Sequence, residues 1–115
     1  MFDEDEAKKK QLQTLNKQFL EKMQQFHENY AEIFRGHSNN EIQTKFGETV
    51  QELLNINSEM IKICIVSNKP VNLMNERRKN IIKAEEEVQT MLDTQKSTIN
   101  NFENVATPYI INIYH

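Results

Sequence analysis

Turn-forming residues are scarce in this sequence, which has only two glycines and two prolines among its 115 residues. An average protein of this length would have about 8 glycines and about 6 prolines. Short strands need frequent turns, and glycine and proline are prominent in such turns. The sequence therefore predicts an all-α protein made of a few long helices, and its length predicts a single domain over residues 1–115.

The first segment has the apolar spacing of an amphipathic helix. Its apolar residues recur three or four positions apart, which places them on one helical face. Acidic residues at 3–6 favour a helix N-terminus, and Arg35 followed by Gly36 indicates a C-terminus. The sequence predicts a helix over about 4–35. Its apolar face contains Leu12, Leu15, Phe19, Met23, Phe26, Tyr30 and Ile33.

A second helix is predicted over about 39–66. Residues 38–41 read Ser-Asn-Asn-Glu, which has the Ser-x-x-Glu form of a capping box. Further apolar residues flank its main seam and widen the apolar face beyond that of a two-stranded coiled coil, as expected for a four-helix bundle. The seam itself contains Ile42, Phe46, Val50, Leu53, Asn57, Met60 and Cys64.

A third helix is predicted over about 71–103, after the break at Pro70. Its heptad seam is interrupted by the polar residues Arg78, Glu85 and Gln95. We therefore expect a partner to help order this helix. The tail at 104–115 could form a short strand, dock on another chain or fray, and these alternatives stay open.

Asn57 is the polar residue within the second seam. A buried amide needs a hydrogen-bond partner, so Asn57 could fix the register between helices. Alternatively, a slight rotation of the helix would place Ile56 in the core instead. The sequence leaves both alternatives open.

The sequence predicts no catalytic residues, no metal site and no cofactor. Its three histidines lie in different segments, and its single cysteine cannot complete a Cys-x-x-Cys motif. Cys64 lies among apolar residues, which favours a structural thiol over a nucleophile. The aromatic residues have helical spacing and are expected in the bundle interior rather than in a ligand pocket. They are Phe19, Phe26, Tyr30, Phe34 and Phe46.

The charge pattern gives no signal for nucleic acid, since the net charge is −3. Arg77, Arg78, Lys79 and Lys83 precede the acidic residues 85–87, a pattern typical of ion pairs along a helix. The longest apolar run, 61–66, is too short to span a membrane and contains Lys62. One cysteine fits a reducing compartment. We expect a soluble intracellular protein without direct membrane or nucleic-acid contacts.

Three stretches of the chain resemble the Mediator subunit 22 family, components of the Mediator of RNA polymerase II transcription. The first runs from Leu15-Asn16-Lys17-Gln18-Phe19 through Phe26 to Tyr30-Ala31-Glu32-Ile33-Phe34. The second contains Val50, Leu53, Met60 and the run from Ile61 to Asn72. The third contains Glu76-Arg77-Arg78 and the heptads up to Thr98. The resemblance covers about Leu15 to Thr98.

This resemblance implies a non-enzymatic structural subunit of the Mediator head module in the nucleus, which helps couple regulators to RNA polymerase II. It implies a helical hairpin that pairs with a subunit 11-like helical partner in a four-helix bundle. The pair would join a subunit 17-like head scaffold as an obligate hetero-oligomer. The partner-binding residues would be Leu15, Phe19, Met23, Phe26, Tyr30, Ile33, Phe46, Val50, Leu53, Asn57, Met60 and Cys64.

Two other interpretations fit the same periodicity. The chain could be a small coiled-coil subunit of a cytoplasmic vesicle-tethering or organelle-positioning adaptor complex, because such subunits are also long polar helices with interrupted heptads. It could also be a three-helix monomer or homodimer without a specific partner. Helical spacing alone does not separate these interpretations from the first.

Overall fold

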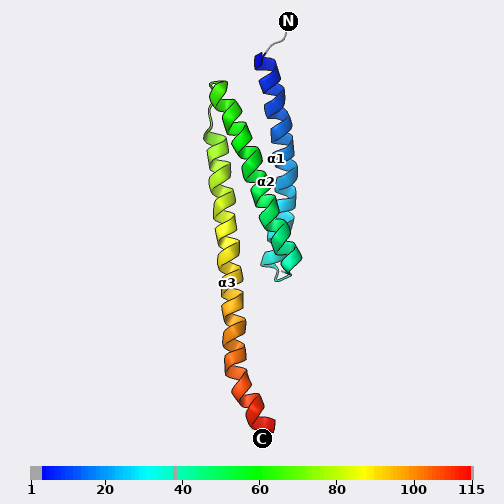
Figure 1. Cartoon of the computed structure of the whole chain (residues 1–115), viewed down its shortest axis with the longest axis vertical. Helices are drawn as coiled ribbons and strands as arrows, with labels where there is room; N and C mark the ends of the chain where they lie inside the picture. The colour runs from blue at the N-terminus through cyan, green and yellow to red at the C-terminus, as the bar shows by residue number, and fades with distance from the viewer. Residues whose placement is uncertain (1–3, 38, 115) are drawn as a thin grey trace. The chain divides into compact units, whose positions relative to one another are not determined.

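The computed structural model describes the backbone of residues 4–37 and 39–114, and the side-chain surroundings of these residues as far as Lys96. It contains three long helices, α1 (Glu4–Phe34), α2 (Asn40–Val66) and α3 (Asn72–Tyr114), shown in Figure 1. The predicted all-α class is confirmed. The chain divides into two compact units, Met1–Glu85 and Glu86–His115, and each is described by itself. The candidate site belongs to the first unit.

Both turns in the first unit follow the same local design. At the end of α1, Gly36 has a φ of 82°, and its N–H donates to Ile33 O while the N–H of His37 donates to Glu32 O. At the end of α2, Asn68 has a φ of 56° and takes the equivalent place. Both are Schellman motifs, in which a residue in the left-handed region satisfies the last helical carbonyls. Glycine and asparagine are the residues that adopt this conformation most readily.

The N-terminus of α2 is capped by Asn39 rather than by the predicted Ser38. Asn39 Oδ1 accepts a hydrogen bond from Ile42 N at 2.9 Å, so that the helix begins at Asn40. A short amide side chain in extended backbone reaches this amide as well as a serine hydroxyl does. Ser38 itself lies outside the described residues.

The third helix ends later than its sequence predicts. The helix α3 continues to Tyr114, whereas the expected end was about 103. Pro108 removes one backbone donor but leaves the rest of the helical hydrogen bonds possible, so a helix can pass through it. The segment expected as a strand or a frayed tail is therefore helical up to Tyr114. Its side chains lie outside the described residues, and the expected docking of this tail stays a prediction.

The core of the first unit lies mainly between α1 and α2, which run antiparallel (Figure 1). Phe26 and Phe46 meet across this contact, with ring centroids 5.2 Å apart. Lys22 Nζ and Glu52 Oε2 form an ion pair at 2.6 Å beside it. The buried apolar residues of the two helices are Phe19, Phe26, Ile33, Phe46, Val50, Leu53, Met60, Ile63 and Cys64.

The start of α3 packs on this hairpin less extensively than α1 packs on α2. Met74 and Ile81 are its buried residues within the first unit. Met74 forms a small cluster with Met60 and Cys64 of α2, against which Leu12 and Leu15 of α1 also pack. The two polar seam positions in this part of α3 avoid full burial, because Arg78 is exposed and Glu85 half-buried. Looser packing of α3 leaves part of α1 uncovered.

Candidate functional site

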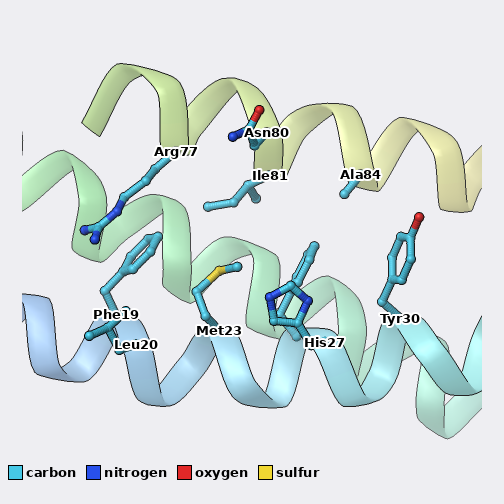
Figure 2. A pocket seen from close by; sticks show the side chains of 10 residues that line it. Phe19, Leu20, Met23, His27, Tyr30, Arg77, Asn80, Ile81 and Ala84 are labelled. Carbon is cyan, nitrogen blue, oxygen red and sulfur yellow. The ribbon is translucent and has the colours of Figure 1, made fainter. Parts of the chain in front are cut away.

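An apolar groove of about 500 Å³ lies between α1 and the start of α3 (Figure 2). Its lining residues extend along α1 from Phe19 to Tyr30, which corresponds to roughly 17 Å of helix at 1.5 Å per residue. The groove is lined by Phe19, Leu20, Met23, Phe26, His27, Tyr30, Arg77, Asn80, Ile81 and Ala84.

The α1 side of the groove is a second apolar stripe beside the core stripe. Leu20, Met23, His27 and Tyr30 follow one another at spacings of three and four, so they lie on one face of the helix. Leu20 is 54% exposed, while Met23 and Tyr30 are half-buried. α1 is therefore apolar over two adjacent faces, of which α2 covers one and the groove leaves the other open.

Phe34 extends this second stripe beyond the groove. It was expected in the bundle interior, but it is 45% exposed and stacks on Tyr30 with ring centroids 4.4 Å apart. The expectation was wrong for this residue because Phe34 lies one position after the buried Ile33, and a step of one residue turns a side chain by about 100° around the helix.

The α3 side of the groove combines apolar and polar side chains. Ile81 is buried and forms an apolar wall, whereas Asn80 is exposed. Ala84 contributes only a methyl group to the lining, and Tyr30 points from α1 towards α3 (Figure 2). Arg77 occupies the end of the groove near Phe19.

Arg77 is the one arginine or lysine among the groove-lining residues that the structure describes. Its guanidinium carbon lies 4.5 Å from the centroid of the Phe19 ring, and Nη1 donates to Asn16 Oδ1 at 2.8 Å. Burial lowers the pKa of the guanidinium from its usual value, although the group keeps its charge at neutral pH. Within the described part of the chain, no carboxylate forms an ion pair with Arg77.

The ion pairing expected between the basic cluster and the acidic residues 85–87 stays a prediction. Lys79 Nζ lies 3.6 Å from Glu76 Oε1, a carboxylate that precedes the cluster on the same helix. Arg77 instead contacts α1, through an aromatic ring and an amide. Arg77 thus packs on α1, whereas its sequence neighbours Arg78 and Lys79 are exposed.

Asn57 is buried, with 1% of its surface exposed, and Ile56 is half-buried. The alternative in which Ile56 replaces Asn57 in the core is wrong. Asn57 Nδ2 donates to the backbone oxygen of Met74 at 2.8 Å, which joins α2 to the start of α3. This hydrogen bond supports a role in register, which stays a prediction.

Most of the predicted partner-binding residues lie inside the chain's own core. The buried ones are Phe19, Phe26, Ile33, Phe46, Val50, Leu53, Asn57, Met60 and Cys64. Leu15, Met23 and Tyr30 are half-buried. The groove brings together Phe19, Met23, Phe26 and Tyr30. In this arrangement a partner in the groove would meet mainly Met23 and Tyr30, because Phe19 and Phe26 are buried.

Sequence reasoning missed six of the groove-lining residues. These are Leu20, His27, Arg77, Asn80, Ile81 and Ala84. A signal for the α1 members was present, because Leu20, Met23, His27, Tyr30 and Phe34 form a second heptad stripe. On α3, Ile81 lies on the predicted heptad seam. Arg77, Asn80 and Ala84 had no comparable signal, since their role depends on how α3 lies against α1.

The otherwise apolar lining of the groove includes the polar side chains of His27, Arg77 and Asn80. Among the described residues there is no cluster of three or more His, Cys, Asp or Glu side chains that could hold a metal ion. No helix in the part of the chain searched is long and apolar enough to cross a membrane.

The chain matches no protein family, no curated protein and no solved structure with which it was compared.

Proposed function

We propose that this protein is a non-enzymatic structural subunit that pairs with another helical chain. The observation that carries the proposal is the open groove between α1 and α3. In the first unit, α2 packs on α1 and is joined to α3 through Asn57 and Met74. A fourth helix placed in the groove would contact both α1 and α3 and complete a four-helix bundle.

The composition of the groove suits a helix from a protein partner. Met and aromatic side chains are enriched at the centres of protein interfaces, and the groove presents the half-buried Met23 and Tyr30. Its length on α1 corresponds to about three helical turns. An amphipathic helix with apolar residues at i, i+3, i+4 and i+7 would cover Leu20 and fill the space beside Ala84.

The assembly that we propose is the head module of Mediator, in the nucleus. The support for this assignment is the sequence resemblance between Leu15 and Thr98. In this proposal a subunit 11-like chain supplies the helix that occupies the groove. The pair then joins a subunit 17-like scaffold as an obligate hetero-oligomer and helps couple regulators to RNA polymerase II.

The test compares two leucines with similar exposure. Leu20 is 54% exposed and lines the groove, whereas Leu73 is 59% exposed and lies outside it. Full-length tagged protein, wild type or carrying Leu20→Asp or Leu73→Asp, is used to purify binding proteins from nuclear and cytoplasmic extracts. A carboxylate buried under a partner helix costs several kcal/mol unless it is paired. We expect wild type and Leu73→Asp to recover Mediator head subunits equally, and Leu20→Asp to recover at least about tenfold less.

Three results would contradict the proposal. Equal recovery by all three proteins would show that the groove is not the contact. Recovery of vesicle-tethering or organelle-positioning subunits from the cytoplasmic extract would favour the adaptor interpretation. Recovery of nothing except further copies of the chain would favour the homodimer. Circular dichroism of each purified variant checks that the helices are intact.

A further inference from the structure

We propose that the groove selects an amphipathic helix of another chain that places an Asp or Glu side chain opposite Arg77. This inference rests on the proposed function, because it requires the groove to bind a helix. It adds the chemistry by which the partner is recognised, and it predicts that the acidic residue of the partner helix lies near Phe19.

The geometry of Arg77 leaves room for a further acceptor. A guanidinium has five N–H donors. One nitrogen, Nη1, donates to Asn16 Oδ1, and the face of the group lies over the Phe19 ring. Figure 2 shows the guanidinium at the Phe19 end of the groove. Both contacts hold the group in place, and neither neutralises its charge.

Covering the groove would remove Arg77 further from water. Arg77 is half-buried before any partner binds, and this burial lowers the pKa of its guanidinium. Complete burial of an unpaired cation is costly, and a carboxylate can offset this cost through paired N–H···O hydrogen bonds. A Lys or Arg on the partner at the same point would add like-charge repulsion to the desolvation cost. Arg77 therefore discriminates between acidic and basic helices.

The remaining lining of the groove determines where the partner helix needs apolar side chains. Leu20 and Met23 on α1 and Ala84 on α3 favour apolar side chains along the middle of the helix. Tyr30 lies about three turns of α1 away from Phe19. The acidic residue should thus lie roughly two to three turns from the residue that packs on Tyr30.

A second copy of this chain is a poorer occupant. The apolar stripes that pack the first unit together are already used in its own core. The remaining stripe on α1 contains Leu20, Met23, His27, Tyr30 and Phe34, and it has no carboxylate to place against Arg77. Since this stripe has no carboxylate of its own, we propose a different chain as the source of the acidic group.

The experiment is a selection from a displayed library of amphipathic helical peptides. Their apolar positions vary among Leu, Ile, Met and Phe, and their flanking positions vary among Asp, Glu, Gln, Lys and Arg. The targets are full-length wild type, Arg77→Glu and Arg78→Glu. Arg78 is the matched control, because it is the exposed neighbour of Arg77, lies outside the groove lining and undergoes the same change in charge.

We expect wild type and Arg78→Glu to enrich Asp or Glu at one flanking position by about tenfold or more over Lys and Arg. Arg77→Glu should reverse that preference. A selected peptide and its Glu→Gln version are then titrated by fluorescence anisotropy. Wild type should bind the Glu peptide about tenfold more tightly than the Gln version, and Arg77→Gln should bind the two equally. Arg77→Gln provides this comparison even where Arg77→Glu fails to fold.

The outcomes separate this inference from the proposed function. Enrichment of apolar peptides without any charge preference would overturn the acidic partner and leave the helix-binding groove intact. Failure of folded wild type to enrich any amphipathic peptide would count against the groove as a helix site altogether. A charge preference that disappears equally in Arg77→Glu and Arg78→Glu would also overturn the role of Arg77, since it would reflect overall charge.

Discussion

At the scale of single residues, Asn57 places an amide in a contact that is otherwise apolar. It is buried beside Met60 and Met74, and its Nδ2 donates to the backbone oxygen of Met74. Within the described residues, Oδ1 accepts no hydrogen bond. A buried polar group is costly when its partner is lost, so the position of Met74 relative to Asn57 matters for stability. We predict that this hydrogen bond favours one register of α3 on α2.

Replacement of Asn57 by aspartate should make stability depend on pH. The substitution removes the Nδ2 donor and buries a carboxyl, which raises its folded-state pKa above the unfolded value of about 3.9. A raised folded pKa means that stability is present below the unfolded pKa and is lost as pH rises through the folded pKa. We expect Asn57→Asp to lose about 3 kcal/mol at pH 7, and to recover most of it near pH 4 when compared with wild type at the same pH.

Urea unfolding followed by circular dichroism at the two pH values measures this effect. Asn55→Asp is the control, because Asn55 is exposed on the same helix and the change in charge is the same. Equal unfolding midpoints for the two variants at pH 7 would contradict the structural role assigned to Asn57.

At the scale of elements, the two glycines have opposite roles. Gly36 has a φ of 82° and ends α1, whereas Gly47 lies inside α2 without a positive φ. Apart from the adjacent residues and the local helix backbone, a methyl group added at either position would meet no atom within 4 Å. Backbone conformation alone should therefore decide the effect of each substitution.

Gly36→Ala should destabilise the protein by about 1 kcal/mol, because alanine is strained in the left-handed region. Gly47→Ala should stabilise it by about 0.5 to 1 kcal/mol, because alanine favours a helix interior. The shift of the urea midpoint at constant slope measures both changes. If the two substitutions shifted the urea midpoint in the same direction, this would contradict the placement of Gly36 in a left-handed turn and of Gly47 inside a helix.

Periodicity predicted the helices well because it reports the faces of each helix directly. It predicted α1 to within a residue or so and placed the breaks at Gly36 and Pro70. It missed the extent of α3, since proline weakens a helix by an amount that neighbouring residues can offset. The element boundaries that depend on one side chain, such as the cap at Asn39, were also displaced by a residue.

The groove was harder to predict than the helices. Leu20 and Met23 are apolar at helical spacing, but spacing does not state which other helix covers them. Arg77 follows Glu76 and precedes Arg78 and Lys79 in sequence, and nothing local distinguishes it from those neighbours. Only the approach of α3 to α1 places Arg77 over Phe19. Tertiary arrangement, rather than pattern, defines this site.

At the scale of the whole molecule, the low apolar share agrees with the proposed dependence on a partner. Apolar residues make up 37% of the chain, below the roughly 45 to 50% of average globular proteins. The first unit uses its apolar residues for a core between α1 and α2 and leaves a groove that it does not fill. We infer that a helix from another chain supplies the missing contacts.

The most direct test of this claim is site-specific photo-crosslinking of the full-length protein in cells. A photoreactive phenylalanine derivative replaces Leu20 in one protein and Leu73 in another, because both leucines are exposed and only Leu20 lines the groove. We predict that position 20 forms a strong crosslink to one helical protein other than this chain, and that position 73 does not form that crosslink. Crosslinks from position 20 only to further copies of the chain, or the same products from both positions, would contradict the account.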